Sequence, residues 1–251
     1  MLFLMRSSMG ISDTIRIHYP QERAAEVLRF YRDYVKEVPD ELTTIVILRR
    51  LPHLQKIPPF MRGKPVIGIA ACYAGLIEDG ERVVQPLRAF GPALMDGISL
   101  KPYLTHQTMF DAGQPPGRHN YWKTAYLSGL DDTAIDVIVE GGRTMTSGLS
   151  GMALYQLGGA ARLGEAAFCL NAAATWTDPA ETDRHVGWTR DLWSAVEPCS
   201  TSGADANFLG EEGEERTRSA YREHYDQLVA LKNQYDPDNL FCLNQNIRPT
   251  V

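Results

Sequence analysis

The segment at residues 66–73, which reads VIGIAACY, constrains the fold of this chain more than any other feature. It is apolar almost throughout, whereas a strand with one face in water alternates apolar and polar side chains. A near-continuous apolar run is typical of a strand that is covered on both faces. The segment therefore predicts a central strand of a sheet.

Further strands and helices are predicted on both sides of this segment. Alternation or β-branched content predicts strands at residues 14–19, 42–48, 98–103, 120–127, 152–157 and 168–175. Helical spacing of apolar residues, or a capping pattern, predicts helices at residues 21–36, 78–90, 131–139, from Asp178 onward and from Glu211 onward. Because strands and helices do not alternate strictly, we expect an α+β fold: one large, mostly antiparallel sheet with helices on one face. No repeat or linker divides the chain, so residues 1–251 are expected to form a single domain.

Composition excludes several classes of function. The formal net charge of −6 opposes nucleic-acid binding, which needs a basic face. No apolar run approaches the roughly 20 residues that span a bilayer, and the short apolar start is a poor signal peptide. We therefore expect a cytoplasmic protein without membrane contact. The four cysteines and six histidines are scattered, with no metal-ligand spacing, so isolated thiols and no metal site are expected.

Several catalytic motifs are absent or incomplete. No phosphate-binding loop and no dinucleotide-binding glycine turn occurs. Residues 148–151 (GLSG) are one residue too short for a nucleophile elbow. The carboxylate pairs Asp131–Asp132 and Glu211–Glu212 each stand at a predicted helix start, where capping is the expected role.

The C-terminal region carries the most specific pattern. Residues 231–241 (LKNQYDPDNLF) lead into residues 244–249 (NQNIRP), which gives a helix, a D-P-x-N turn and an N-Q-N-I tail in that order. This pattern resembles the C-terminal signature of berberine-bridge-enzyme-like oxidases of the vanillyl-alcohol-oxidase superfamily. The segments at residues 120–123 (NYWK) and 176–179 (WTDP) are similar to the same family, so the resemblance extends over the chain from about residue 20.

The resemblance implies a fold, a cofactor and a reaction. It implies a substrate-binding domain with its sheet over the flavin, ending in a berberine-type segment at about residues 205–251. It also implies FAD, and oxidation of an alcohol, sugar or amine by hydride transfer to the flavin. The family's N-terminal FAD-binding domain is expected to be missing from this sequence, so a separate flavin-binding domain or chain would be needed. The alternative is a non-catalytic remnant or a binding module that lacks flavin.

The resemblance also assigns candidate residues. Asp205 occupies the position of the usual tyrosine, as a base or as a solvated loop acid, and leaves the catalytic residue unassigned. The cofactor-binding candidates are Asn207, Asn244, Gln245 and Asn246, with a turn or a tie to backbone groups as their alternative roles. Tyr121 and Lys123 are the substrate-facing candidates, with an exposed lysine at a sheet edge as the alternative. Finally, without a flavin domain to bury it, an apolar face is expected to cause self-association.

Overall fold

The structure is a computed structural model of the whole chain. It describes residues 12–13, 15–55, 57–97, 99–101, 104, 107–108, 111, 115–159, 165–201, 214–243 and 245–251.

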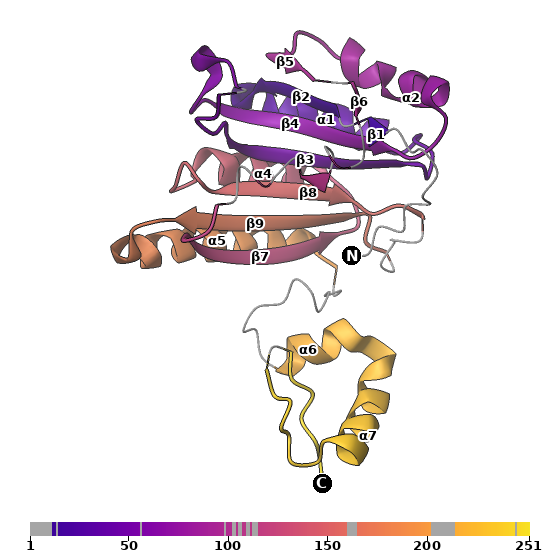
Figure 1. The fold of residues 1–251 in the computed structure, drawn as a ribbon, viewed down its shortest axis with the longest axis vertical. Coiled ribbons are helices and arrows are strands. Elements are labelled where there is room, and N and C mark those ends of the chain that lie inside the picture. Colours follow the sequence, from indigo (N-terminus) through magenta and orange to yellow (C-terminus); the bar gives the residue numbers. More distant parts are fainter. Residues whose placement is uncertain are drawn as a thin grey trace.

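A seven-stranded sheet forms the centre of the molecule (Figure 1). Its strand order is β5-β2-β4-β3-β8-β9-β7, and every neighbouring pair is antiparallel. The strands are β2 (Ile15–Pro20), β3 (Leu42–Arg50), β4 (Pro65–Tyr73), β5 (Met95–Asp96), β7 (His119–Leu127), β8 (Gly151–Gln156) and β9 (Phe168–Trp176). The short strands β1 (Ser12–Asp13) and β6 (Leu100–Lys101) pair separately. The apolar segment at residues 66–73 is β4, which pairs with β2 and β3, so the prediction of a strand inside the sheet is confirmed.

Helices cover one face of this sheet. They are α1 (Ala24–Tyr34), α2 (Ile77–Ala89), α4 (Asp132–Arg143) and α5 (Thr182–Val196). Of these, α1, α4 and α5 lie behind the strands in Figure 1, and α2 lies near the edge formed by β2 and β5. Their buried apolar residues join those of alternate strand positions in one core, to which α1 contributes Val27 and Leu28 and α5 contributes Trp188 and Leu192. The predicted α+β fold with helices on one face is therefore confirmed.

A buried hydrogen-bond chain joins three elements of this core. The Tyr31 hydroxyl of α1 lies 2.7 Å from the Thr44 hydroxyl of β3, and Thr44 donates to Gln156 Oε1 of β8 at 2.6 Å. Tyr31 and Thr44 are fully buried. Because Thr44 uses its proton on Gln156, Tyr31 is the donor to Thr44. The chain fixes β3 against both a helix and its neighbouring strand.

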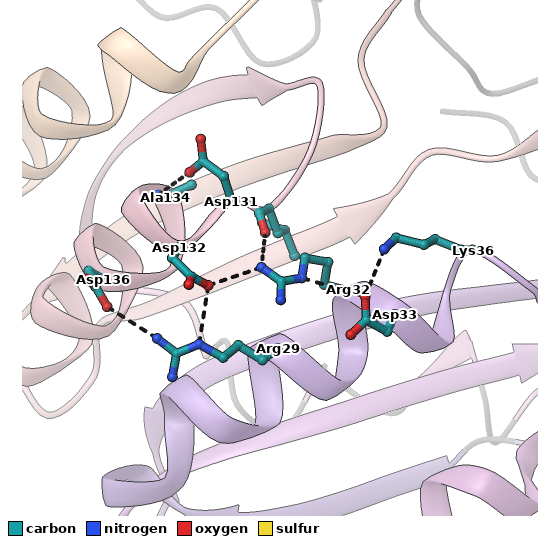
Figure 2. Close-up of polar contacts among 9 residues, drawn as sticks. Arg29, Arg32, Asp33, Lys36, Asp131, Asp132, Ala134 and Asp136 are labelled. Carbon is teal, nitrogen blue, oxygen red and sulfur yellow. Dashed lines mark hydrogen bonds and ion pairs between the residues drawn. The ribbon is translucent and has the colours of Figure 1, made fainter.

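Acidic residues at the start of α4 bind basic residues of α1 (Figure 2). Asp131 accepts a hydrogen bond from the Ala134 backbone N–H at 2.8 Å and caps the helix. Asp132 accepts from Arg29 Nε at 3.2 Å and from Arg32 Nη1 at 3.0 Å, and these hydrogen bonds lower the pKa of the Asp132 carboxyl. The predicted capping role is confirmed for Asp131, whereas Asp132 joins α4 to α1, which the sequence did not predict.

The outer edge of β7 is partly covered by the end of α5 and the residues after it. The Trp193 indole N–H donates to the Thr124 carbonyl oxygen at 3.2 Å. The Thr201 backbone N–H donates to the Tyr126 carbonyl oxygen at 2.6 Å. Two carbonyl groups that face away from the sheet thus have donors.

Two further helices, α6 (Glu214–Tyr221) and α7 (Tyr225–Tyr235), lie apart from the sheet (Figure 1). The residues after α7 run back beside it, so the predicted helix and turn near Asp236 are confirmed. Short 3₁₀ helices occur at Gln21–Arg23, Pro59–Met61, Pro179–Glu181, Glu197–Cys199 and Arg222–His224. No helix of the described residues is both long enough and apolar enough to cross a membrane.

Candidate functional site

The sheet has a second face, opposite the helices, on which the other alternate positions of each strand lie. On β3 this alternation separates fully buried residues such as Val46 and Leu48 from the partly exposed residues Ile45, Ile47 and Arg49. The strand register extends the second face to Gly68 and Ala70 of β4, Ala153 and Tyr155 of β8, Asn171 and Ala173 of β9, and Trp122 and Thr124 of β7.

Two small apolar clusters cover diagonally opposite corners of the second face. One contains Val66 of β4 and the residues Leu51, Ile57 and Met61 that follow β3. The other contains Tyr126, Leu157, Ala166 and Cys169. The middle of the face lies between these clusters.

A row of four residues crosses this middle region, and we call it the central row. Trp122 of β7 pairs with Ala173 of β9, Ala173 with Gly151 of β8, and Gly151 with Arg49 of β3. The Trp122 side chain is 44% exposed. A Cβ added at Gly151 would lie 3.4 Å from Arg49 Cβ, which shows how closely these two residues adjoin. The row therefore has two large side chains at its ends and two small residues as its floor.

Polar side chains flank the central row on β7 and β9. Asn171 Nδ2 donates to the Thr124 hydroxyl at 3.2 Å. On the other side, the Thr175 hydroxyl donates to Asn120 Oδ1 at 2.9 Å, and Ser150 Oγ accepts from the Thr175 backbone N–H at 3.1 Å. Thr124, Thr175 and Ser150 are buried, whereas Asn171 is partly exposed and Asn120 is exposed. The two amides near the indole are therefore the groups able to bond polar groups of a small molecule.

Arg49 is the charged group of the central row. Burial lowers the pKa of its guanidinium, and the positive charge of Arg118 lowers this pKa further. Arginine stays protonated despite such shifts. The second face therefore carries the positive charge of Arg49.

The substrate-facing candidates Tyr121 and Lys123 lie on the helix side of β7. Arg190 Nε of α5 donates to the Tyr121 hydroxyl at 3.3 Å, and Lys123 Nζ lies 4.6 Å from the centre of the Trp193 ring. Alternation along the strand directs Trp122, which lies between them, to the second face. A substrate role for Tyr121 and Lys123 remains a prediction.

Sequence reasoning missed Arg49 and Trp122. The predicted strand ended at residue 48, whereas β3 continues to Arg50, which adds Arg49 to the set formed by Ile45 and Ile47. The signal was present in the alternation, because residues 45, 47 and 49 share one face of an extended strand.

The C-terminal tail folds back on α7 through side-chain hydrogen bonds. Asp236 accepts from the backbone N–H groups of Leu240 at 2.7 Å and Phe241 at 3.0 Å, and it also pairs with Lys232. The hydrogen bond from Lys232 and those from the two backbone groups lower the pKa of the Asp236 carboxyl. Asn233 Oδ1 accepts from the Thr250 backbone N–H at 2.7 Å, which ties the end of the chain to the helix.

The structure describes two of the cofactor-binding candidates, both in this tail. Gln245 and Asn246 are partly buried. Asn246 Oδ1 is a buried acceptor to which no group of the described residues donates a hydrogen bond. Such an oxygen suits a hydroxyl or ring N–H of a bound cofactor. Asp205, Asn207 and Asn244 lie outside the described residues, so their roles remain predictions.

The C-terminal segment also matches a family model. Residues 204–248 match the model described as berberine and berberine-like. An FAD-linked oxidoreductase of Dictyostelium discoideum is 24% identical over 245 residues, which cover 92% of this chain. The chain is therefore similar to berberine-bridge-enzyme-like FAD-linked oxidoreductases. An uncharacterized FAD-linked oxidoreductase of Bacillus subtilis, YgaK, is 24% identical over 181 residues, which cover 67% of this chain.

Solved structures of berberine-like and related oxidases share the fold. The structure of 6-hydroxy-D-nicotine oxidase from Arthrobacter nicotinovorans superposes with a TM-score of 0.76 at 20% identity, covering 95% of this chain and 54% of that one. The berberine-bridge-enzyme-like protein 28 of Arabidopsis thaliana gives a TM-score of 0.74 at 16% identity, covering 96% of this chain and 57% of that one.

The chain spans 50% of the length of the Dictyostelium relative and 40% of the length of the Bacillus relative. Among the described residues, no His, Cys, Asp and Glu side chains gather in a group of three that could hold a metal ion.

Proposed function

We propose that this chain is the substrate-binding half of an FAD-dependent oxidoreductase, which oxidises an alcohol, sugar or amine together with a flavin-binding domain or chain. In this proposal the sheet and the berberine-type segment at about residues 205–251 act as one substrate-binding unit. The observation that carries it is the combination of the berberine-like tail with a sheet fold found in about half of each solved oxidase.

The chain's own residues would bind and orient the substrate. The central row offers an exposed indole at Trp122, and the amide of Asn171 lies beside it. In the tail, Asn246 Oδ1 offers a buried acceptor to the cofactor. When bound, FAD would supply the hydride acceptor. Asp205 remains a candidate base, because desolvation raises the pKa of a carboxyl toward a useful range.

A chimera tests this proposal. The part of the Dictyostelium relative that this chain does not match would be joined to this chain, and flavin absorbance would be recorded after desalting. The chimera should keep flavin, and an oxidisable alcohol, sugar or amine should bleach its band without oxygen. This chain alone, mixed with FAD, should keep none.

The intact Dictyostelium relative is the control, since it shows that both the flavin-binding part and the substrate panel are competent. A chimera that loses flavin while the control keeps it would contradict docking of the two parts. The chimera could instead keep flavin while no compound of the panel bleaches it, including those that bleach the control. This result would favour the alternative of a non-catalytic remnant or binding module. Flavin retained by this chain alone would contradict the need for a partner domain.

A further inference from the structure

The connection between β3 and β4 carries positive charge that no neighbouring acid balances. Residues 42–77 contain five Lys or Arg and no Asp or Glu, whereas the whole chain has a formal charge of −6. We call residues 50–64 the basic loop. Within the described part of the chain, its cations Arg50, Arg62 and Lys64 form no ion pair with a carboxylate, whereas every arginine of α1, α2 and α4 does. The loop thus keeps its charge available for a partner.

The basic loop buries apolar side chains beneath it but leaves Phe60 outside. Ile57 and Met61, on either side of this residue, are only 7% and 1% exposed and join a small core cluster. The Phe60 side chain is 66% exposed. Backbone hydrogen bonds of 2.8 and 3.0 Å close the base of the loop. Because the loop is fixed from within, the exposed ring is a feature of the fold.

The turn that carries Phe60 has few backbone groups left to hydrate. Pro58 and Pro59 have no N–H group. Their carbonyl oxygens accept from the backbone N–H groups of Met61 at 2.9 Å and Arg62 at 3.3 Å. Arg62 Nε also donates to the Ile57 carbonyl oxygen at 2.9 Å. Since an apolar medium penalises unpaired backbone groups, this turn loses less than an ordinary loop when water is removed.

Cations lie at the same end of the loop as the exposed ring. Lys64 Nζ lies 6.0 Å from the centre of the Phe60 ring. Arg50 Nη1 donates to the carbonyl oxygen of Gly63, the residue before Lys64, at 3.2 Å. Arg50 and Lys64 are both exposed. Long cationic side chains around an exposed ring suit a lipid interface, where the ring enters the acyl boundary and the charges stay among the headgroups.

We propose that the basic loop binds the surface of an anionic lipid bilayer, with Phe60 below the headgroups and Arg50 and Lys64 among the lipid phosphates. An acidic polypeptide would also balance the cations, but it would not require a turn with so few free backbone groups. The sequence argument against membrane contact considered a segment that spans the bilayer, whereas a loop at the surface needs no such length. The acidic remainder of the chain opposes this contact weakly, because salt screens charges beyond about 8 Å.

Cosedimentation of the purified chain with lipid vesicles tests the inference. Vesicles of phosphatidylcholine and phosphatidylglycerol in equal parts should bind the chain, and pure phosphatidylcholine vesicles should bind it roughly 25-fold more weakly. The double variant Arg50→Gln, Lys64→Gln should lose the same factor, because each cation near an anionic surface contributes about fivefold, or about 1 kcal/mol. Phe60→Ala should weaken binding about tenfold, since it removes the buried ring. In Phe60→Trp, anionic vesicles should shift the emission maximum to shorter wavelength.

The C-terminal region supplies matched controls, because it lies apart from the sheet (Figure 1). Arg222→Gln with Arg248→Gln removes the same net charge from exposed positions and should leave vesicle binding unchanged. Phe241 is 77% exposed, so Phe241→Ala removes a similar ring and should also leave binding unchanged. All of these variants replace exposed side chains, and circular dichroism should show that each one is folded.

Five results would overturn the inference: no binding to the anionic vesicles, equal binding to pure phosphatidylcholine, unchanged binding in Phe60→Ala, equal losses in the control variants, or polyglutamate binding as tight as vesicle binding. The last result would assign the basic loop to an acidic protein partner. Flavin takes no part in this experiment, so the outcome of the chimera does not decide it.

Discussion

The hydrogen-bond chain from Tyr31 through Thr44 to Gln156 predicts which of two substitutions should destabilise the protein more. Tyr31→Phe removes one hydrogen bond and leaves Thr44 still donating to Gln156. Thr44→Val removes both hydrogen bonds and also leaves the buried Tyr31 hydroxyl without its acceptor. The second substitution should therefore be the more damaging, although it conserves side-chain shape better than most changes.

The magnitudes follow from the two kinds of loss. A neutral hydrogen bond contributes about 0.5–1.5 kcal/mol, so Tyr31→Phe should lower the free energy of unfolding by that amount. A stranded buried hydroxyl costs about 1–3 kcal/mol, so Thr44→Val should cost about 2–4 kcal/mol in total. In the double variant the stranded hydroxyl is gone, and about 1–3 kcal/mol should be recovered relative to the sum of the single variants.

Urea unfolding followed by circular dichroism would measure all four proteins of this cycle. The reasoning would be refuted if Tyr31→Phe cost as much as Thr44→Val, or if the double variant were additive. Either result would mean that Tyr31 is not the donor to a hydroxyl that depends on it.

Three further predictions concern the surface and the tail. The Trp122 indole is 44% exposed, so acrylamide should quench part of the tryptophan fluorescence, and this quenchable part should be lost in Trp122→Phe. Unchanged quenching in the variant would mean that the second face is covered. Phe241 and Leu243 are 77% and 84% exposed, so replacing both by Ser should reduce the self-association that we propose for the isolated chain, as measured by sedimentation; an unchanged assembly would place the interface elsewhere. Asp236 has a lowered pKa, so its stabilising contribution is complete above the ordinary aspartate pKa and is lost as pH falls through the lower folded value. The protection factor of the Leu240 amide, which compares its exchange rate with the intrinsic rate at the same pH, should therefore fall in acid, and in Asp236→Asn it should already be low at neutral pH. A protection factor in the variant that matched wild type would contradict this linkage.

Much of the fold could be predicted because burial leaves a periodic trace in the sequence. The β-branched run at residues 42–48 and the apolar run at 66–73 predicted two adjoining strands of the sheet, and the Asp131 cap predicted the start of α4. Strand order could not be predicted, because pairing such as β3 with β8 joins segments about a hundred residues apart and depends on the whole core.

The site was less predictable, for a different physical reason. Alternation shows that Tyr121 and Lys123 share one face and Trp122 takes the other, but it does not show which face the helices cover. Successive residues of this strand, such as Ala125 and Tyr126, are buried on both faces of the sheet. The sequence therefore lacks the contrast between an apolar and a polar face that would show which face the helices cover. The position of Arg49 likewise depends on three strands that meet only in the folded chain.

The contacts on the outer edge of β7 affect how this sheet meets other chains. An edge strand with free backbone groups is a template for strand addition and aggregation. The indole of Trp193 and the backbone of Thr201 already occupy the carbonyls of Thr124 and Tyr126, so a foreign strand would have to displace them before it could extend the sheet there. The end of α5 and the residue that follows it thus hinder strand addition along half of β7. For a substitution at Trp193, the solubility of the chain should therefore be measured as well as its stability.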